Sequence, residues 1–373
     1  MATAAEVLAA ERLHQAAQAR LAAAAAYIAL AEWQSVSPLN PQDTAESWLR
    51  NSILVIVAIR KLSRKLAVSH YQLIRALETG RTLGVPEGSP DEDVTLGELR
   101  KNFRDNALDV AALPSPRTRS DDPDIRWFEE QLASVNPDTV PGTVRLEDAE
   151  VDPLIQDLLD VEGRDSDTEI TVDDFEWPED LTAEEVNDVY HDQLRKRIVT
   201  PLADKGKALR SSPELTPDQV ITQIEDSHSK SGSTGSGTVE SAGLDAGRAA
   251  VTTAIRNDRL VLAVARGTSS DPCAFCAMLA SRGFVYKNNQ TAGVDEDDVV
   301  KKYHVHCRCF PIYRWVKEST LPPLNAYFKK QWPIVTAGYS GVDALNAWRR
   351  WIYAKRKNNP GAPHGSLNNK PPQ

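Results

Sequence analysis

Cysteine is scarce in this chain of 373 residues, and all four cysteines lie between positions 273 and 309. Disulfide-stapled secreted domains distribute their bridges over the whole framework, so this clustering argues against that class. Residues 1–11 contain two glutamates and no basic residue, unlike a secretory signal peptide. The closest approach to a membrane span, the apolar run Ile53–Ile59, is about a third of the roughly 18 to 20 residues required. The sequence therefore predicts a soluble protein made inside the cell, without a membrane partner.

Several catalytic motifs are also missing. The chain has neither the H-E-x-x-H helix of zinc proteases nor the G-x-S-x-G elbow of α/β-hydrolases. The Pro-Cys-x-x-Cys sequence at 272–276 matches half of the nucleobase-deaminase signature, but no H-x-E half precedes it. It also lacks the flanking βαβ pattern of a thioredoxin-type redox site. The Ser/Gly-rich segment 231–237 lacks the Lys-Ser/Thr pair of a phosphate-binding loop. These absences argue against the familiar enzyme classes.

Acidic residues are concentrated in the middle of the chain. The formal charge is −10, yet residues 147–192 contain 19 acidic side chains and one basic side chain, so the remainder is net positive by about 8. This block is interpreted as a solvated, partly disordered linker, with a docking strip for a basic partner surface as the alternative. Within it, Asp173 and Asp174 are expected to be solvated charges rather than an acid/base pair.

The C-terminal segment has the opposite charge, because no acidic residue follows Asp343. Its basic residues are expected to form a disordered, solvent-facing tail. Contact with nucleic acid phosphates or with an acidic protein surface is a further hypothesis for this tail.

The N-terminal part predicts two long helices. Residues 3–33 are dominated by alanine, leucine, glutamate, glutamine and arginine, which favour helix. A second helix is predicted from an N-cap at Asp43 to Leu77, with Gly80 beyond its end. Its apolar residues recur at spacings of three, four and seven and form a narrow seam, so the helix needs a helical partner. Packing against residues 3–33 of the same chain is favoured over packing between two copies.

Taken in order, the chain predicts a mainly α protein with a small α+β, zinc-stapled domain near the C-terminal end. A helix is expected over Ala246–Leu262, with a strand beginning at Val261 as the alternative, and Pro311–Trp315 is expected to be a strand. The first half of the predicted organisation is an N-terminal helical domain (1–83) and a Pro-rich and acidic linker region (84–180), which contains a helical patch at Leu96–Leu108. A helical segment (181–226) follows and opens with a Thr182–Glu185 capping box, and a flexible Gly/Ser linker (227–243) then divides the chain. The last parts are a zinc-binding C-terminal domain (244–335) and a segment with a short helix (Val342–Ala354) and the basic disordered tail (336–373).

The cysteines themselves carry the strongest local signal. A Cys-x-x-Cys pair is followed about thirty residues later by a His-x-His-Cys-x-Cys stretch. Zn²⁺ takes four sulfur or nitrogen ligands, so the two pairs predict a closed tetrahedral zinc site, with disulfides or free thiols as alternatives. Thiolates bind zinc more tightly than imidazole at neutral pH, which favours the four cysteines, and His304 is the substitute if the Cys-x-Cys turn cannot present both sulfurs. The candidate ligands are Cys273, Cys276, His304, His306, Cys307 and Cys309.

The same segments resemble a known family. Asp271-Pro-Cys-Ala-Phe-Cys-Ala-Met-Leu-Ala-Ser-Arg-Gly283 and Tyr303-His-Val-His-Cys-Arg-Cys309 resemble the C-terminal domain of MuF-like minor capsid proteins of tailed phages, in the form found in phages of actinobacteria. The segment from Trp48 through Tyr71-Gln-Leu-Ile-Arg-Ala-Leu-Glu-Thr-Gly80 resembles the opening of that family. The resemblance implies that residues 244–335 are a MuF-like domain whose metal ligands are drawn from Cys273, Cys276, His304, Cys307 and Cys309.

The resemblance implies two alternative functions. The first is a low-copy component of the phage head, associated with the portal protein and with the major capsid or scaffold protein, which acts in head assembly or in genome packaging and ejection. Such a protein would be in the host cytoplasm during assembly and in the head interior of the virion afterwards, with its basic tail near packaged DNA. The second is a capsid maturation protease, a label that relatives in actinobacterial phages often carry. The family supplies no agreed nucleophile, and the candidates here are His304 or His306 with Ser281.

Overall fold

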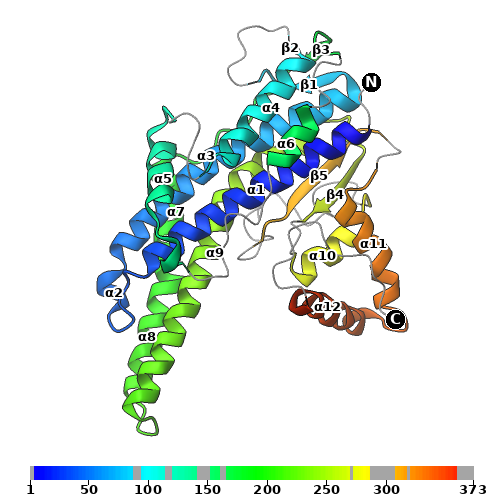
Figure 1. Ribbon diagram of the computed structural model, residues 1–373. Coiled ribbons are helices and arrows are strands. Elements are labelled where there is room, and N and C mark those ends of the chain that lie inside the picture. The colour runs from blue at the N-terminus through cyan, green and yellow to red at the C-terminus, as the bar shows by residue number, and fades with distance from the viewer. Residues whose placement is uncertain are drawn as a thin grey trace.

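The computed structural model is mainly helical, with a small α+β unit near its C-terminal end, which confirms the predicted fold class (Figure 1). Its short strands form a three-stranded sheet and a separate two-stranded ribbon. No helix among the residues described combines the length and the apolar character that crossing a lipid bilayer requires. The structure describes residues 4–86, 94–113, 120–140, 152–159, 165–268, 272–285, 307–316 and 320–358.

Three long helices form the core of the molecule. α1 (Ala4–Trp33), α3 (Glu46–Thr79) and α9 (Pro217–Asn257) pack against one another and run side by side (Figure 1). α1 is buried around most of its circumference, because its many alanines let neighbouring helices approach from several sides. The helix predicted over residues 3–33 is confirmed.

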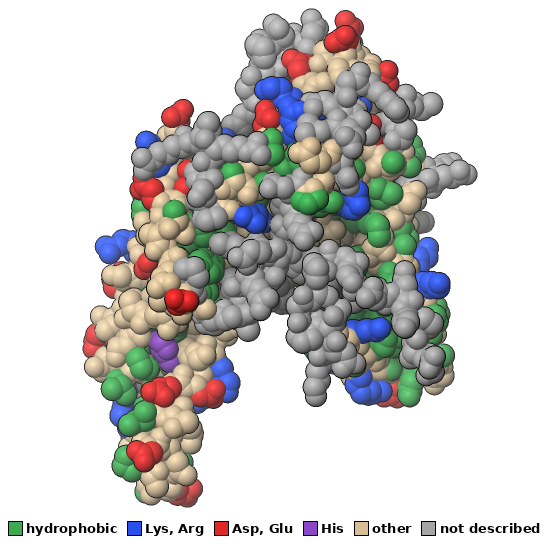
Figure 2. Space-filling view, viewed as in Figure 1, with side chains coloured by type: hydrophobic (Ala, Val, Ile, Leu, Met, Phe, Trp, Pro, Cys, Tyr) green, Lys and Arg blue, Asp and Glu red, His purple; other side chains and the backbone are tan. Residues whose placement is uncertain are grey.

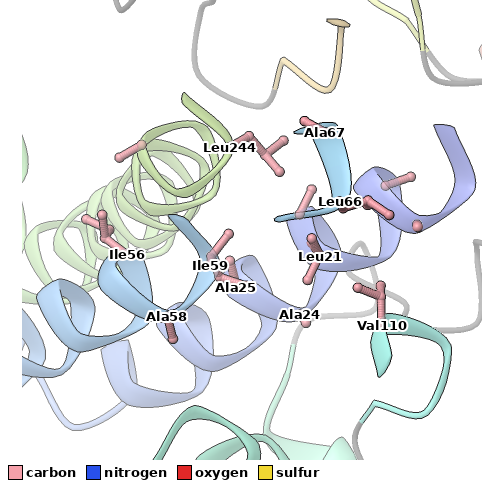
Figure 3. Close-up of a cluster of buried hydrophobic side chains, with 14 of the residues drawn as sticks. Leu21, Ala24, Ala25, Ile56, Ala58, Ile59, Leu66, Ala67, Val110 and Leu244 are labelled. Atoms are coloured by element: carbon pink, nitrogen blue, oxygen red, sulfur yellow. The ribbon is translucent and has the colours of Figure 1, made fainter. Parts of the chain in front are cut away.

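Small and branched aliphatic side chains fill the centre of this bundle. Leu21 and Ala25 of α1, Ile59 and Ala67 of α3, and Leu244 of α9 all belong to one buried cluster (Figure 3). Burying such surface stabilises a fold by roughly 25 cal/mol for each Å² removed from water. The predicted packing of the two N-terminal helices within one chain is therefore confirmed.

The connection between α1 and α3 differs from the prediction at its start. Asp43 does not cap α3, because it lies inside a separate one-turn helix, α2 (Pro41–Thr44), and α3 begins after Ala45. Proline favours the first position of a helix, since its fixed φ is already helical, and Pro41 thus starts this extra turn. The predicted end of α3 is confirmed: Gly80 follows the helix with a φ of 70°, the left-handed conformation of a C-terminal cap.

The predicted flexible linker at 227–243 is wrong, because these residues lie inside α9 and most of them are buried. Glycine disfavours helix, but it lets two helix backbones approach closely. A Cβ on Gly243 would lie 2.4 Å from Cγ2 of Ile59, and one on Gly247 would lie 2.6 Å from the carbonyl oxygen of Ser63. Tertiary packing against α3 therefore outweighs the low helix propensity of this stretch.

Two further helical segments pack against the long helices, the first against α3 and the second against the first half of α9. α7 (Ala183–Leu194) begins with the predicted capping box, in which the Thr182 hydroxyl accepts a hydrogen bond from the Glu185 N–H. A π-helical turn (Arg195–Val199) leads directly into α8 (Thr200–Arg210), which packs beside α9 and forms with it the long hairpin at the bottom of Figure 1.

The region predicted as a linker, residues 84–180, contributes helices and strands in its described parts. The helical patch predicted at Leu96–Leu108 is confirmed and starts at a capping box formed by Thr95 and Glu98. The three short strands form a sheet of order β1-β3-β2, with β1 parallel and β2 antiparallel to β3. β1 (Arg81–Leu83) lies just before this region, and the elements within it are β2 (Val94–Thr95), α4 (Leu96–Ala111), α5 (Pro123–Ser134), a 3₁₀ turn (Pro137–Thr139), α6 (Asp152–Leu159) and β3 (Glu169–Asp173).

The acidic block contacts arginines of the same chain. Asp173 is paired rather than simply solvated: it accepts hydrogen bonds from Arg81 and, at 2.6 Å, from Arg75, and these bonds hold the pKa of its carboxyl below the usual range. Asp180 accepts a hydrogen bond from Nε of Arg60 at 3.0 Å. Part of the block is therefore paired with arginines of α3 and β1 in the same chain, whereas the predicted docking of a basic partner surface stays a prediction.

The C-terminal part combines a ribbon with three helices. β4 (Ala263–Gly267) pairs antiparallel with β5 (Phe310–Arg314). α10 (Ala274–Ser281), α11 (Pro323–Val335) and α12 (Gly341–Asn358) pack together beside this ribbon, at the lower right of Figure 1. The strand predicted near 311–315 and the helix predicted near 342–354 are confirmed, whereas α10 and α11 had no predicted counterpart.

The boundary before this ribbon supports the strand alternative. The helix expected over Ala246–Leu262 ends at Asn257, and the chain is a strand from Ala263. Residues 359–373, which hold most of the predicted disordered tail, lie outside the described residues.

Gly243→Ala should lower the free energy of unfolding by roughly 1 to 3 kcal/mol, because the added methyl group overlaps Ile59 in a close helix interface. Gly206→Ala in α8 is the matched control, since a Cβ there would meet only the Arg210 guanidinium at 3.7 Å. The control should be neutral or raise stability by up to about 1 kcal/mol. Urea unfolding followed by circular dichroism measures both variants. Equal stabilities would mean that the contact between α3 and α9 does not need a glycine.

Candidate metal centre

The first pair of cysteines lies at the start of α10. Cys273 is the N-cap residue, and its sulfur accepts a hydrogen bond from the Cys276 N–H at 3.3 Å. The spacing of three residues therefore places both sulfurs at one end of this helix. The positive end of the helix dipole lies there and favours a thiolate.

The second pair lies just before β5 and is almost completely buried. Cys307 and Cys309 have exposed fractions of 2% and 3%. Their sulfurs and that of Cys276 all lie within 4.8 Å of one another, and the Cys276 and Cys307 sulfurs are 3.6 Å apart. A tetrahedral ion with metal–sulfur bonds of about 2.3 Å holds its sulfurs about 3.8 Å apart, so the spacing fits such an ion. Three buried cysteines are thus placed to bind a metal ion.

The remaining predicted ligands have different placements. Cys273 is half-buried and packs against the three clustered cysteines, and all four cysteines are free of disulfide bonds. His304 and His306 lie outside the described residues. Within the described part, the structure therefore brings Cys276, Cys307 and Cys309 together, with Cys273 beside them.

A buried arginine of α9 fixes the backbone of the second pair. Nε of Arg248 donates to the Cys309 carbonyl oxygen at 3.1 Å, and Nη2 donates to the Cys307 carbonyl oxygen. Nη1 donates to Asp245, one turn earlier on α9, at 2.8 Å. One guanidinium thus holds the Cys-x-Cys turn through two nitrogens, and its third nitrogen is bound by Asp245 of the same helix. Such outer contacts orient the ligands of metal sites and tune their affinity.

The residue between the two cysteines also contacts α9. Nε of Arg308 donates to the Glu240 carboxylate at 2.8 Å, and the Glu240 side chain is fully buried. Farther along the helix, burial raises the pKa of Asp245 to about 6, although the neighbouring Arg248 opposes this shift. Three charged side chains of α9 therefore surround the Cys-x-Cys turn.

The sequence analysis missed Glu240, Asp245 and Arg248. Glu240 falls in the predicted linker 227–243, Asp245 just before the helix predicted over Ala246–Leu262 and Arg248 within that helix, so no single predicted helix placed the three on one face. The available signal was the pair Gly243 and Gly247, four residues apart, which is a spacing that places small residues on one side of a helix.

The clustered thiols influence one another's ionisation. Hydrogen bonds from Cys276 and Cys309, together with the positive charges of Arg248 and Arg266, lower the pKa of the Cys307 thiol far below its usual range. Hydrogen bonds among the thiols raise the pKa of Cys276, and burial raises that of Cys309. Because neighbouring like charges oppose ionisation, a divalent cation is what would allow all the sulfurs to be thiolates together.

A small cavity adjoins this centre. It has a volume of about 20 Å³, which is room for about one water molecule. His14, Gln18, Arg248, Cys309 and Tyr313 are among its lining residues. The cavity is far smaller than an organic substrate requires.

Two buried histidines next to the cavity join three elements. His14 of α1 and His70 of α3 stack with ring centroids 4.2 Å apart, and Nδ1 of His70 is 2.7 Å from the hydroxyl of Tyr313 on β5. Burial lowers the pKa of His14 to about 3 and lowers that of His70 well below its ordinary value. Both rings are therefore neutral at pH 7.

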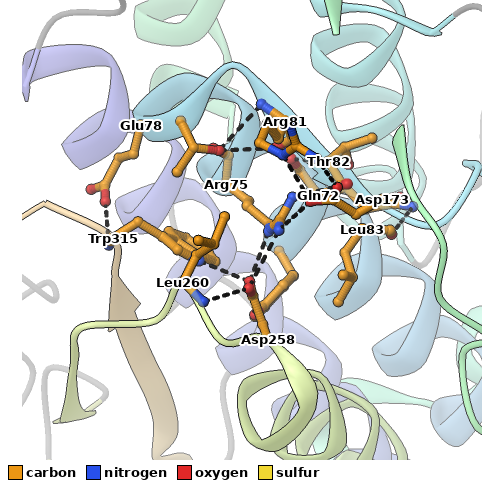
Figure 4. Close-up of polar contacts among 12 residues, drawn as sticks. Gln72, Arg75, Glu78, Arg81, Thr82, Leu83, Asp173, Asp258, Leu260 and Trp315 are labelled. Atoms are coloured by element: carbon orange, nitrogen blue, oxygen red, sulfur yellow. Dashed lines mark hydrogen bonds and ion pairs between the residues drawn. The ribbon is translucent and has the colours of Figure 1, made fainter. Parts of the chain in front are cut away.

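A second polar cluster holds the far end of β5 (Figure 4). Asp258, just beyond α9, accepts hydrogen bonds from Nε of Arg75 at 2.7 Å and from the Trp315 indole at 2.8 Å. The Glu78 carboxylate accepts the Trp315 backbone N–H at 2.7 Å. Burial by itself would raise the pKa of Asp258, but the hydrogen bonds from Arg75 and Trp315 bring it below its ordinary value. β5 is thus tied to α3 and α9 beyond one end, and its preceding cysteines are tied to α9 beyond the other.

A model of a viral protein family, described as VG15 protein, matches residues 177–332. The matched stretch runs from before α7 into α11, and it includes the clustered cysteines and Arg248. The similarity indicates a phage protein. It covers less than half of the chain and bears on the part that carries the candidate metal centre. No curated protein and no solved structure matches the chain significantly.

Arg248→Lys should weaken zinc binding by about ten- to a hundredfold, because lysine keeps the charge beside Asp245 but cannot hold both cysteine carbonyls. Arg210→Lys, an exposed substitution of the same kind on α8, is the matched control and should leave affinity unchanged. Cys276→Ser should remove tight binding altogether. Competition with a chromophoric chelator measures all three affinities. Wild-type affinity in Arg248→Lys would mean that the Cys-x-Cys turn does not depend on α9.

Stability should fall as the pH is lowered from about 6.5 to about 5, because of the two buried histidines. In this window histidines of the unfolded chain bind protons, whereas His14 and His70 in the folded chain do not, so protons favour unfolding. Each histidine should contribute a loss of about 2 kcal/mol at pH 5. In His14→Gln the unfolding free energy should fall by about 2 kcal/mol less between pH 8 and pH 5 than in the wild type, and the partly exposed His191→Gln is the control. An unchanged slope in His14→Gln would rule out this origin.

Proposed function

We propose that this chain is a MuF-like minor capsid protein that acts in phage head assembly at the portal, with zinc as a structural clasp. The observation that carries the proposal is the enclosed cysteine cluster, which is anchored to α9 within the stretch that is similar to a phage protein family. The ligand set is Cys276, Cys307 and Cys309 with Cys273, and His304 is the substitute for a fourth ligand.

The enclosure of the cluster supports a structural role for the metal. A catalytic zinc keeps one coordination position open to water and substrate, whereas a structural zinc is surrounded by protein ligands. Cys276, Cys307 and Cys309 are at most 3% exposed, and the cavity beside Cys309 holds only about one water molecule. In this role the metal joins α10 to the chain that precedes β5, so that both are held on the helical bundle.

The proposed partners are the portal protein and the major capsid or scaffold protein, in the host cytoplasm during assembly and in the head interior afterwards. The three-helix core and the α8–α9 hairpin supply a rigid framework with extended surfaces, as an assembly protein needs (Figure 1). The metal requirement follows from the coupling of folding and binding: without the ion, α10 and the chain before β5 lose the link that joins them.

The alternative, a capsid maturation protease, has less support in the described residues. Ser281, its candidate nucleophile, lies in α10 with an exposed fraction of 6%, and its hydroxyl donates to the Met278 carbonyl oxygen at 2.7 Å. A nucleophilic serine instead needs its hydroxyl next to a base. The candidate bases His304 and His306 lie outside the described residues. We therefore propose assembly rather than proteolysis.

Incorporation into phage heads tests the proposal. Complementing a deletion of the gene with the wild-type chain should give heads that contain it in far fewer copies than the major capsid protein. Cys276→Ser should give few heads or heads that lack the chain, because the C-terminal unit loses its metal. Quantitative mass spectrometry of purified heads measures the copy number, and Arg210→Lys is the control.

The same particles separate assembly from proteolysis. Mass spectrometry of the termini of capsid and scaffold proteins should give the same ends with wild-type chain and with Ser281→Ala. Absence of the chain from heads would contradict the assembly function. Uncut capsid or scaffold termini in Ser281→Ala, with the variant folded and its metal retained, would favour the protease.

A further inference from the structure

The hairpin formed by α11 and α12 concentrates positive charge in a chain that is acidic overall. The two helices contain seven basic residues and one acidic residue, Asp343, whereas the whole chain has a formal charge of −10. On the face seen in Figure 2, Lys and Arg side chains border the lower right lobe, where Figure 1 places these helices. The basic residues are Lys329, Lys330, Arg349, Arg350, Lys355, Arg356 and Lys357.

Four of these side chains are exposed and have no acidic partner among the residues that the structure describes. Lys329, Lys330, Arg349 and Arg350 are all exposed, and within the described chain none of them forms an ion pair with a carboxylate. Many basic side chains on the surface of the helical body do have an acidic partner. Examples are Lys61 with Asp122 and Asp124, Arg195 with Glu46, Lys196 with Asp192, and Lys230 with Asp226.

The outward face of α12 has the composition of a nucleic-acid interface. Arg349 and Arg350 lie one helical turn before Tyr353, whose side chain is 54% exposed, so the three share one face. The centres of protein–protein interfaces are depleted in charge, whereas protein–DNA interfaces are polar and strongly positive. Guanidinium groups also bind phosphate oxygens with two parallel hydrogen bonds.

The inward face of α12 fixes this surface to the candidate metal centre. Trp348 is buried and its indole N–H donates to the Ala274 carbonyl oxygen of α10 at 2.9 Å, next to Cys273. Trp348 also stacks on Trp351 with centroids 4.9 Å apart, and the Lys355 ammonium lies 5.9 Å from the Trp351 ring. The arginines are therefore presented by a packed element rather than by a flexible tail.

We propose that the outward face of the α11–α12 hairpin binds the phosphate backbone of double-stranded DNA through Arg349 and Arg350. Duplex DNA carries one negative charge per about 1.7 Å of its axis, so even a short helical face meets several phosphates. The inference rests on the charge and exposure of the hairpin and not on the proposed role in head assembly. Arg349 and Arg350 lie inside α12, within the helix predicted over Val342–Ala354, and not in the predicted disordered tail.

Fluorescence anisotropy with the full chain and a labelled duplex of about 30 base pairs tests the proposal. Binding should weaken steeply as salt is raised from about 50 to about 300 mM, because phosphate contacts release counterions. Arg349→Gln/Arg350→Gln should weaken binding at least about tenfold and make the log–log salt slope shallower by about two. Lys205→Gln/Lys207→Gln on the exposed side of α8 removes the same charge elsewhere and should have little effect.

Three results would overturn the proposal. The first is no binding to the duplex at about 50 mM salt, and the second is an equal loss in the α8 control, which would indicate attraction by the protein as a whole. The third is displacement of the duplex by poly-glutamate as readily as by unlabelled duplex, which would indicate an acidic protein partner. Zinc content and thermal unfolding of each variant confirm that it is folded. Failure of the chain to enter heads would leave the DNA measurement unaffected, so the two proposals can fail separately.

Discussion

The close approach of α9 to α1 and α3 is the constraint on which the rest of the structure depends. Gly243 and Gly247 let α9 lie against Ile59 and Ser63 at a distance that any side chain would prevent. That approach also sets the orientation of the polar residues farther along the same helix. Arg248 reaches the cysteine turn, and Asp258 receives Arg75 and Trp315, because α9 lies at this distance and in this rotation. One helix interface thus positions the segments that come just before and just after β5.

The candidate metal centre is therefore an extension of the bundle rather than an independent module. Its ligands come from the start of α10 and the chain before β5, but the backbone of the Cys-x-Cys turn is held by α9. A small domain often depends on its metal alone for stability, because it has too little apolar core. Here the metal would join two segments that already contact a large core. Because the core holds these segments as well as the metal, the C-terminal helices can present exposed arginines in a fixed orientation.

Much of the helical framework could be predicted from sequence, because it depends on local signals. The periodicity of α3, the capping box at Thr182 and the glycine after α3 are each fixed by neighbours within a few residues. The stretch 227–243 could not be predicted in this way, since its Gly- and Ser-rich composition is shared by flexible linkers and by close helix interfaces. Whether such a stretch is a linker or a helix depends on a packing partner, which here is α3. For the site, spacing identified the cysteines, but Arg248 and Glu240 act through contacts about sixty residues apart in sequence.

The π-helical turn at Arg195–Val199 keeps the buried residues of α7 and α8 on nearly the same side of the helix axis. Buried residues along α7 and α8 recur every four positions, at Val186, Tyr190, Leu194, Ile198, Leu202 and Gly206. In a regular α-helix each step of four overshoots a full turn by about 40°, so five such steps would carry the apolar stripe about 200° around the axis. The π-helical turn is wider and contains one more residue than a regular turn. This reduces the accumulated rotation of the apolar stripe by about 100°, which is half of the drift. If this turn became a regular α-helix with all its residues retained, the buried face of α8 would rotate by about 100° away from α9.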